Sequence, residues 1–316
     1  MMNLLASIII RTYNEQQYLE DLLQEIGNQV IDDLRYEVII VDSGSTDKTL
    51  EIAKKFNCKI LHIHKSQFSF GRSLNIGCAA AKGDYLVFIS GHCIPINSLW
   101  LINLLKPLMV GNVVATYGRQ LGGKTTKFSE NLIFAKFYPN HSQIPQKGYF
   151  CNNANAALLK SVWRLYPFNE SLTGLEDMYL GKQLVKANMF IGYVAEAAIY
   201  HHHHEPSSII KRRYEREAIA LKEIMPEVQI NFIDFLRYFT SAILLDTFIA
   251  IKHKKILSHF GEIFIFRLMQ FWGSYCGNNE HKKLSNRMKE IYFYPNVQNE
   301  TNKKITDNQQ ETMEKI

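Results

Sequence analysis

The sequence has few of the features that mark specialised classes of protein. It has only 5 cysteines in 316 residues, in no CxxC spacing, and 8 prolines. An odd number of cysteines cannot form a complete disulfide framework, so we expect a reducing, cytoplasmic setting. No uncharged apolar stretch reaches the roughly 18 residues that a membrane span requires. The start MMNLLASIII lacks the basic segment that opens a signal peptide.

Charge of either sign is limited, but its distribution is uneven. The net charge is +6, and basic residues cluster late, in IIKRRYER (209–216), IKHKK (251–255) and HKK (281–283). Such clusters favour an acidic partner such as anionic lipid, a phosphate-bearing substrate or nucleic acid, although a charge run is more often a solvated face. The runs contain no recognisable nucleic-acid-binding module, so we expect no nucleic acid.

The first half of the chain alternates strands with helices. Apolar, β-branched runs predict strands within 4–14, 35–56, 58–64 and 85–90, and helical spacing predicts a helix after each of the first two strands and another over 71–83. This alternation is typical of a parallel sheet with right-handed crossovers. Such sheets bind ligands at the carboxyl ends of their strands, so the polar residues just after each strand are the candidates for function.

The second half is less regular. It predicts a helix in SLWLINLLKPLM, a strand in GNVVATYGRQL, a strand and helix in KGYFCNNANAALLKSVWRLY, and a helix, a strand and a histidine cluster over 175–204. Aromatic-rich helices begin near residue 229. The segment 296–316 is polar enough to be a disordered tail.

Polar residues follow the first two strands. Thr12, Asn14 and Glu15 come after the first, and Asp42 opens the segment DSGSTD after the second. A carboxylate at Asp42 could accept a hydrogen bond from a base or from a ribose hydroxyl. Alternatively, DSGSTD is simply a helix-capping sequence.

Four motifs in order give the chain a resemblance to a known family. SIIIRTYNE (7–15), VIIVDSGSTDKT (38–49), GRSLNIGCAAAKGDYLVFIS (71–90) and GLEDMYLGKQL (174–184) resemble the family 2 glycosyltransferases, particularly bacterial rhamnosyltransferase-like members. The resemblance implies the GT-A fold: an α/β domain with a mostly parallel central sheet and helices on both faces. We expect this domain over 1–205, a helical C-terminal region over 206–295 and the tail over 296–316.

The resemblance also implies a nucleotide site. The family's first loop, here Thr12, Asn14 and Glu15, contacts the nucleotide, and the aspartate after its second strand, here Asp42, binds the base. Asn75 matches an asparagine of the third motif. The arginine that often precedes that asparagine is replaced by Leu74, so a diphosphate contact from nearby Arg72 is an expectation from its charge alone.

After the strand YLVFI, relatives usually carry Asp-x-Asp, which holds magnesium or manganese against the donor diphosphate. This chain has Ser90-Gly91-His92 instead. In one interpretation His92 binds a divalent metal together with His201 and His203 of the cluster IYHHHHEP. In another the site is metal-free, and His92, Arg72 or Lys65 carries positive charge to the diphosphate. In a third, His92 only packs under Pro95.

The resemblance implies an acceptor site at two further motifs. Asp177 would be the general base that deprotonates the attacking hydroxyl, with Glu176 as second choice or acceptor contact; helix capping is the alternative for both. The amides of Asn152, Asn153 and Asn155 could hold sugar hydroxyls or could simply form a turn.

The C-terminal region combines apolar helical faces with basic residues. The segment 231–251 reads as an amphipathic helix and is followed by a second apolar segment, 259–277. These helices could dock on the inner face of the cytoplasmic membrane, pack on the core or form a homodimer contact.

We therefore predict a glycosyltransferase that moves a sugar from a nucleotide-sugar donor to a growing bacterial surface glycan, such as capsule or O-antigen, on a glycan or lipid-linked acceptor. The alternatives are a non-catalytic nucleotide- or glycan-binding subunit and a sugar-phosphate nucleotidyltransferase. The nucleotidyltransferase should have a glycine-rich phosphate loop after its first strand, and RTYNEQQ lacks one.

Overall fold

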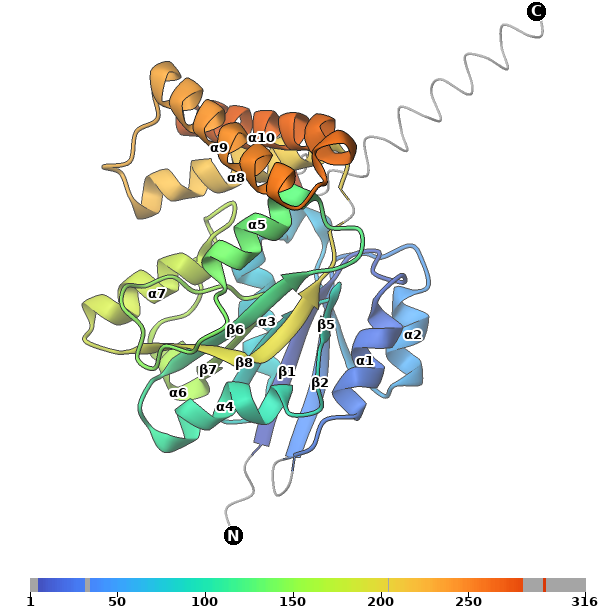
Figure 1. Cartoon of the computed structure of the whole chain (residues 1–316). Helices are drawn as coiled ribbons and strands as arrows, with labels where there is room; N and C mark the ends of the chain where they lie inside the picture. The colour runs from blue at the N-terminus through green and yellow to red at the C-terminus, as the bar shows by residue number, and fades with distance from the viewer. Residues whose placement is uncertain (1–4, 32–34, 204, 281–291, 294–316) are drawn as a thin grey trace, which may run out of the picture.

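An eight-stranded sheet forms the centre of the molecule in the computed structural model, which describes residues 5–31, 35–203, 205–280 and 292–293 (Figure 1). The strand order is β3-β2-β1-β4-β7-β6-β8-β5. Strands β1 to β4, β6 and β8 run in one direction, and β7 and β5 run against their neighbours. The strands are β1 (Leu5–Thr12), β2 (Arg35–Asp42), β3 (Lys59–His62), β4 (Tyr85–Ser90), β5 (Cys93–Pro95), β6 (Ala115–Gly122), β7 (Asn155–Leu159) and β8 (Ile191–His201).

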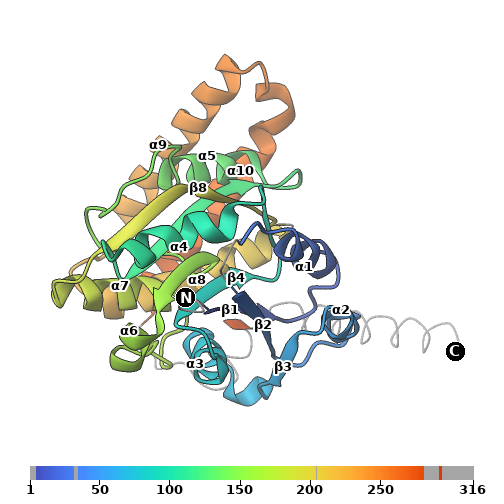
Figure 2. The same ribbon diagram turned by 90° about the horizontal axis from the view of Figure 1, so that it is seen from below.

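Helices cover both faces of this sheet. They are α1 (Leu19–Gly27), α2 (Thr49–Lys55), α3 (Phe70–Ala80), α4 (Trp100–Val110), α5 (Phe128–Phe137), α6 (Lys160–Leu165) and α7 (Glu176–Lys186), with a 3-10 turn at Lys65–Gln67. Alternate residues of β1 point to opposite faces. Ile8 and Ile10 join the core under α1, α2 and α4, whereas Ile9 joins the core under α3, α5, α6 and α7 (Figure 2). The uninterrupted apolar run of β1 follows from this two-sided burial.

Three further helices form the C-terminal region: α8 (Ser207–Ile224), α9 (Phe232–Lys252) and α10 (Ile256–Asn278). Helix α10 lies against α8 at Gly273 and Gly277, where an added Cβ would collide with backbone atoms of Lys211 and Glu215. The predicted tail 296–316 lies outside the described residues. Within the part of the chain that is described, no helix is both long enough and apolar enough to cross a membrane.

A buried ion pair fixes α9 to α10 and to the sheet domain. Arg267 donates from Nε to Asp246 Oδ2 at 2.7 Å and from a terminal nitrogen to Asp246 Oδ1 at 2.9 Å. Ser129 of α5 donates to the same carboxylate at 2.6 Å. Asp246 is 1% exposed and Arg267 7% exposed. The two charges therefore depend on each other, because neither has water to replace its partner.

Candidate active site

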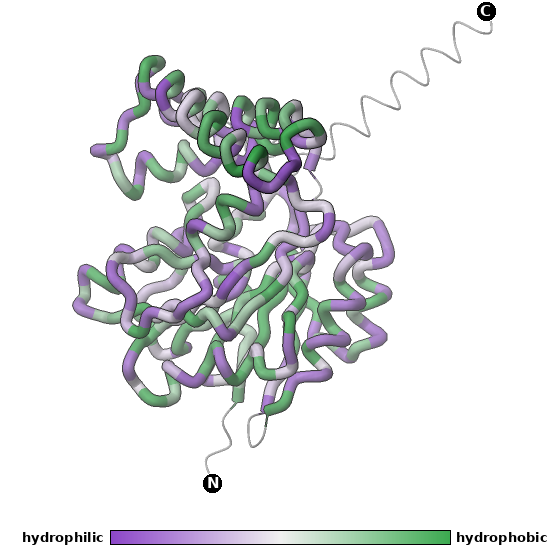
Figure 3. The backbone as a smooth tube through the Cα atoms, viewed as in Figure 1, coloured by the Kyte–Doolittle hydropathy of each residue, from purple (hydrophilic) through white to green (hydrophobic). Residues whose placement is uncertain are grey.

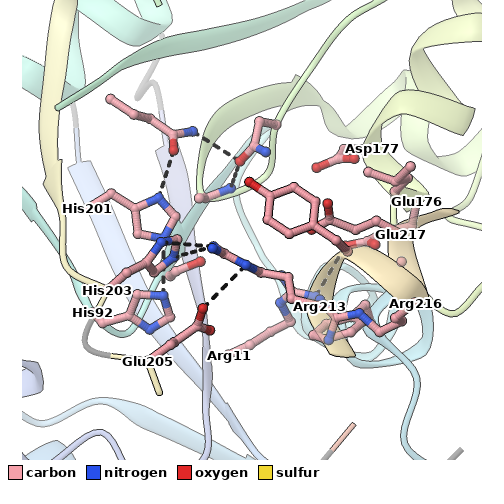
Figure 4. Close-up of a pocket in the computed structure, with 18 of the residues that line it drawn as sticks. Arg11, His92, Glu176, Asp177, His201, His203, Glu205, Arg213, Arg216 and Glu217 are labelled. Atoms are coloured by element: carbon pink, nitrogen blue, oxygen red, sulfur yellow. Dashed lines mark hydrogen bonds and ion pairs between the residues drawn. The ribbon is translucent and has the colours of Figure 1, made fainter. Parts of the chain in front are cut away.

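A cavity of about 600 Å³ opens at the carboxyl ends of the strands (Figure 4). Its walls come from the ends of β1, β4, β6 and β8, from the segment that leads into α7, and from α8. Ligands of open α/β sheets bind in this position. Of the residues predicted for function, the lining includes Thr12, Glu15, Ser90, His92, Asn152, Glu176, Asp177, His201 and His203.

Asp42 organises the loop after β2 and does not line the cavity. Its carboxylate is fully buried and accepts hydrogen bonds from the Thr12 hydroxyl at 3.0 Å, the Ser45 hydroxyl at 2.5 Å and the backbone amides of Gly44 and Ser45 at 2.9 and 3.0 Å. Asn14, at φ 57°, accepts from the Thr46 amide at 2.8 Å. Both residues thus tie the first two loops together, and contact with a nucleotide stays a prediction for them.

Asn75 and Arg72 lie away from the cavity. The Asn75 amide donates to the Phe168 carbonyl and to Glu170, and its oxygen accepts from the Trp163 indole and the Phe168 amide. All its hydrogen-bonding capacity is used to fasten α3 to the segment after α6. Arg72, 43% exposed, lies 3.9 Å from Glu170 on the same outer side. In this structure neither residue is brought to the predicted donor site.

His92 lies between Glu15 and His201. Its Nδ1 is 2.9 Å from Glu15 Oε1, and its Nε2 is 3.2 Å from His201 Nε2. His201 Nδ1 is 2.7 Å from the Gln120 oxygen, and the Gln120 amide donates to Asn152 at 3.0 Å. Because the Gln120 oxygen can only accept, we assign the proton to His201 Nδ1, which leaves a lone pair on Nε2 facing His92.

The pKa values of the two histidines are shifted in opposite directions. Burial alone would lower the pKa of His92, but the Glu15 carboxylate outweighs it and raises that pKa. Burial, together with His203 and His92, lowers the pKa of His201 well below its usual value. His201 is therefore a neutral imidazole, the form that binds metal ions.

The residues around this pair fit a divalent metal. A ring nitrogen of His92, one of His201 and the Cys93 sulfur lie within 4.8 Å of one another. Two nitrogens that each lie about 2.1 Å from one ion are roughly 3.0–3.4 Å apart, and the His92–His201 separation is 3.2 Å. Nitrogen and sulfur ligands suit a borderline ion better than magnesium. Cys93, which directly follows the altered Ser-Gly-His motif, was not expected in this group.

His203 does not join that group in the described structure. Its Nδ1 is 2.8 Å from Glu130 and 2.9 Å from Arg213, and Arg213 in turn lies 2.6 Å from Glu130. Burial would raise the pKa of Glu130, but His203 and Arg213 lower it to about 2. The predicted metal role of His203 thus lacks the geometry that His201 has, and its contacts join β8, α5 and α8.

Asp177 lies on the other side of the cavity, at the start of α7. Its carboxylate accepts from the Asn153 amide at 2.9 Å and from the Met178 amide at 2.7 Å. Burial, followed by the neighbouring Glu176 carboxylate, raises the pKa of Asp177 to about 7. Arg11 binds Glu176 at 3.2 Å. A carboxylate poised near neutral pH at a cavity wall suits a general base.

The three asparagines have different environments. Asn152 lines the cavity and accepts from Gln120 and from the Ala154 amide. Asn153 is 5% exposed and reaches the site only through its backbone contact with Asp177. Asn155 is fully buried and binds the Trp100 indole and the Ala197 carbonyl. Of the three, only Asn152 therefore lines the cavity.

Helix α8 supplies cavity residues that sequence reasoning missed. Arg213, Arg216 and Glu217 line the cavity from one face of this helix. The run 209–216, which contains the two arginines, reads from the sequence as a charge cluster. The signal that could have identified them is their spacing, since residues three and four apart share one face of a helix.

Comparisons with known proteins place the chain in a family. A family model, Glycosyl transferase family 2, matches residues 7–165. An O-antigen chain rhamnosyltransferase of Salmonella anatum is 32% identical over 178 residues, which cover 52% of this chain and 56% of that protein. One of Salmonella typhimurium is 27% identical over 209 residues, 62% of this chain and 65% of that protein. The chain thus spans about three fifths of the length of these relatives.

Solved structures agree on the fold. A mannosyltransferase from Pyrobaculum calidifontis, in complex with GDP-mannose and Mn²⁺, superimposes with a TM-score of 0.59 at 15% identity, over 88% of each chain. A glucosyl-3-phosphoglycerate synthase from Mycobacterium tuberculosis gives 0.52 at 20% identity, over 70% of this chain and 78% of the other. With the family model matching half of the sequence, the chain belongs to the family 2 glycosyltransferases and has the GT-A fold that its motifs predicted.

Proposed function

We propose that this protein transfers a sugar from a nucleotide-sugar donor to the hydroxyl of a growing surface glycan, with inversion at the anomeric carbon. The position of Asp177 is the observation that carries this proposal, because a carboxylate with a pKa of about 7 lines the cavity at the ends of the strands. The O-antigen rhamnosyltransferases among the relatives support a surface glycan as acceptor.

The chemistry needs a base on one side of the cavity and charge stabilisation on the other. Asp177 takes the proton of the acceptor hydroxyl while that oxygen bonds to the anomeric carbon. The bond from this carbon to the donor phosphate breaks, and the nucleoside diphosphate leaves with the electron pair. Asn152 lies in the lining where it can hold a sugar hydroxyl, and Arg11 holds Glu176 beside the base.

For the donor side we propose a divalent ion on His92 and His201, with Cys93 as the third ligand. When bound, such an ion would supply positive charge to the leaving diphosphate. His201 is the stronger anchor because its hydrogen bond to Gln120 at 2.7 Å fixes the ring orientation. Ser90 lines the cavity at the end of β4, beside the expected position of the diphosphate.

The experiment that tests this function is a titration with UDP, dTDP, GDP and CMP, each with Mn²⁺ and again with EDTA, followed by turnover of the sugar nucleotide whose nucleotide binds. We expect selective binding that weakens at least about tenfold in EDTA, since charge-assisted contacts to the diphosphate are lost. His92→Ala should remove this difference, whereas His62→Ala, at the end of β3 and outside the cavity lining, should keep it.

Other outcomes separate the alternatives. Binding that is indifferent to EDTA would contradict the metal site and favour direct charge from His92. Selective binding without any turnover would favour a non-catalytic nucleotide-binding subunit. Release of diphosphate on incubation with a sugar phosphate and a nucleoside triphosphate would instead indicate a nucleotidyltransferase.

We also propose that the α9–α10 hairpin docks on an anionic membrane surface. Figure 3 shows hydrophobic stretches along both helices of the hairpin. Its exposed large apolar side chains include Phe232, Ile233, Leu236, Leu244, Leu245, Phe248, Ile251, Leu257, Phe260, Phe264 and Ile265. Lys252, Lys254 and Lys255 are exposed at the turn between the two helices. Apolar residues beside clustered lysines match an interface of acyl chains and anionic headgroups.

Removing the lysines at this turn should weaken vesicle binding. With each lysine contributing about 1 kcal/mol, Lys252→Gln/Lys254→Gln/Lys255→Gln should reduce partitioning onto vesicles of phosphatidylcholine and phosphatidylglycerol roughly 100-fold, as measured by sedimentation. The matched variant Lys48→Gln/Lys54→Gln/Lys55→Gln removes three exposed charges at α2 and should bind as well as the original. If the protein does not bind vesicles and its mass in solution doubles as its concentration rises, the hairpin is instead a dimer contact.

A further inference from the structure

Three arginines line the cavity, and they differ in how their charge is balanced. Arg11 pairs with Glu176 at 3.2 Å. Arg213 pairs with Glu130 at 2.6 Å and with Glu205 at 3.3 Å. Among the residues that the structure describes, Arg216 has no ion pair with a carboxylate. Arg216 is therefore the cavity cation whose counter-charge is missing.

The surroundings of Arg216 do not replace that counter-charge. Its guanidinium lies 4.5 Å from the centre of the Phe70 ring, and the guanidinium of Arg11 lies 4.9 Å from the same centre. One terminal nitrogen reaches the Tyr292 carbonyl only at 3.5 Å, and the buried Nε has no hydrogen-bond partner. Burial lowers the pKa of Arg216. A buried donor without an acceptor is costly, so an anion in the cavity would relieve it.

None of the nearby carboxylates forms an ion pair with Arg216 in the described structure. Glu130, Glu176 and Glu205 are already paired with Arg213 or Arg11. Glu217 follows Arg216 on α8 and lines the cavity, but no ion pair joins the two side chains in the described structure. Burial raises the pKa of Glu217. Its charge acts on Arg216 only at a distance, so the buried Arg216 Nε stays without an acceptor.

We propose that Arg216, with Arg11 beside it and Phe70 beneath both, forms an anion subsite that holds a phosphate group of the acceptor. A guanidinium offers a planar fork of N–H donors that matches phosphate oxygens. The subsite lies on the same side of the cavity as Asp177. Arg11 binds Glu176, the residue before Asp177. Gly174, in the segment that leads into α7, lies against Arg216 Nε. His92 and His201 are on the opposite side of the cavity (Figure 4). This inference rests on the proposed function, because it names the chemical class of the acceptor.

The test uses inorganic pyrophosphate as the probe and the full chain throughout. The protein is first saturated with the nucleoside diphosphate that binds best, so that the donor site is occupied, and pyrophosphate is then titrated by calorimetry. We expect binding to the original protein and a loss of about tenfold or more in Arg216→Met, the size expected for hydrogen bonds to a charged group. Arg216→Lys should recover part of the affinity, because it keeps the charge without the fork. Arg212→Met, on the same helix but outside the cavity lining, should bind as the original does.

The outcomes separate the two sources of phosphate. If Arg216→Met weakens the nucleoside diphosphate and leaves the nucleoside unaffected, Arg216 serves the donor and the acceptor assignment is wrong. If the nucleotide-saturated original protein does not bind pyrophosphate, the subsite does not exist, whatever the variants do. If no nucleotide binds, the proposed function fails, and the same titration without nucleotide still decides whether Arg216 holds an anion.

Discussion

Asp177→Asn should lower turnover about 10²- to 10⁴-fold, the usual contribution of a general base. The substitution keeps the size of the side chain and one of its two oxygens, so it retains one of the two hydrogen bonds that the carboxylate now accepts from the Asn153 and Met178 backbone amides. It removes the ability to take a proton. Nucleotide affinity should stay within about twofold, because we propose Asp177 as a base for the acceptor and not as a donor contact. Donor turnover and nucleotide titration measure the two effects separately.

The matched control is Asp21→Asn, which neutralises an exposed carboxylate on α1 and should leave turnover unchanged. If Asp177→Asn retains full turnover, Asp177 is not the base, and Glu176 becomes the next residue to test. If nucleotide affinity falls together with turnover, the loop that Asp177 holds through Asn153 has moved. The loss of turnover then comes from a change in structure and not from the loss of proton transfer.

The pH dependence of turnover is a second test of the proposed role of Asp177. A base is active when it is deprotonated, and the pKa of Asp177 is raised to about 7 by burial and by Glu176. Turnover should therefore fall about tenfold per pH unit below 7 and level off above it, as expected for one titrating group. A profile that is flat between pH 5 and 8 would assign the proton transfer to a group with an ordinary carboxylate pKa.

Arg267→Met should lower the free energy of unfolding by about 3–5 kcal/mol, the largest stability effect that we expect from one substitution in this protein. It leaves Asp246, which is 1% exposed, with a buried charge and, among the residues that the structure describes, only the Ser129 hydroxyl as a donor. Methionine fills most of the space of the arginine stem, so the loss is electrostatic in origin. Denaturant unfolding followed by circular dichroism measures it.

A double variant separates charge from packing. Asp246→Leu combined with Arg267→Met removes both charges and should recover most of the loss, since well-packed apolar pairs often replace buried ion pairs at little cost. The control Lys211→Met breaks a partly exposed ion pair with Glu215 on α8 and should cost less than about 1 kcal/mol. A double variant as unstable as Arg267→Met would mean that shape, and not charge, holds α9 and α10 together.

The sheet could be predicted from the sequence because its signal is local and strong. The run that forms β1 is apolar at every position from Ile8 to Ile10, since both faces are covered, and the polar residues after it mark the edge where the cavity opens. The family and the fold followed from four motifs, three that include a strand end and one that includes the start of α7, and were confirmed. The three-residue strand β5 is too short to give a comparable pattern.

The other features of the fold and of the site depend on contacts between residues far apart in the sequence, which no local sequence pattern indicates. Helix α5 buries Ser129 and Glu130, which bind Asp246 and Arg213, so its inner face is polar and its apolar periodicity is lost. Asn75 and Asn155 have the residue type expected of ligand contacts but are used up by tertiary hydrogen bonds. In the opposite sense, Arg216 lines the cavity only because α8 folds back towards it, and Cys93 lies near His201 only because β5 pairs with β8.

The two glycines of α10 determine how far α8 lies from the rest of the C-terminal region. Each glycine inside a helix costs about 1 kcal/mol relative to alanine, yet Gly273 and Gly277 let the backbones of α8 and α10 touch directly. Main-chain atoms cannot change rotamer, so this contact fixes the distance between the two helices. Because α8 supplies part of the cavity wall, Gly273 and Gly277 help to set the width of the cavity without lining it.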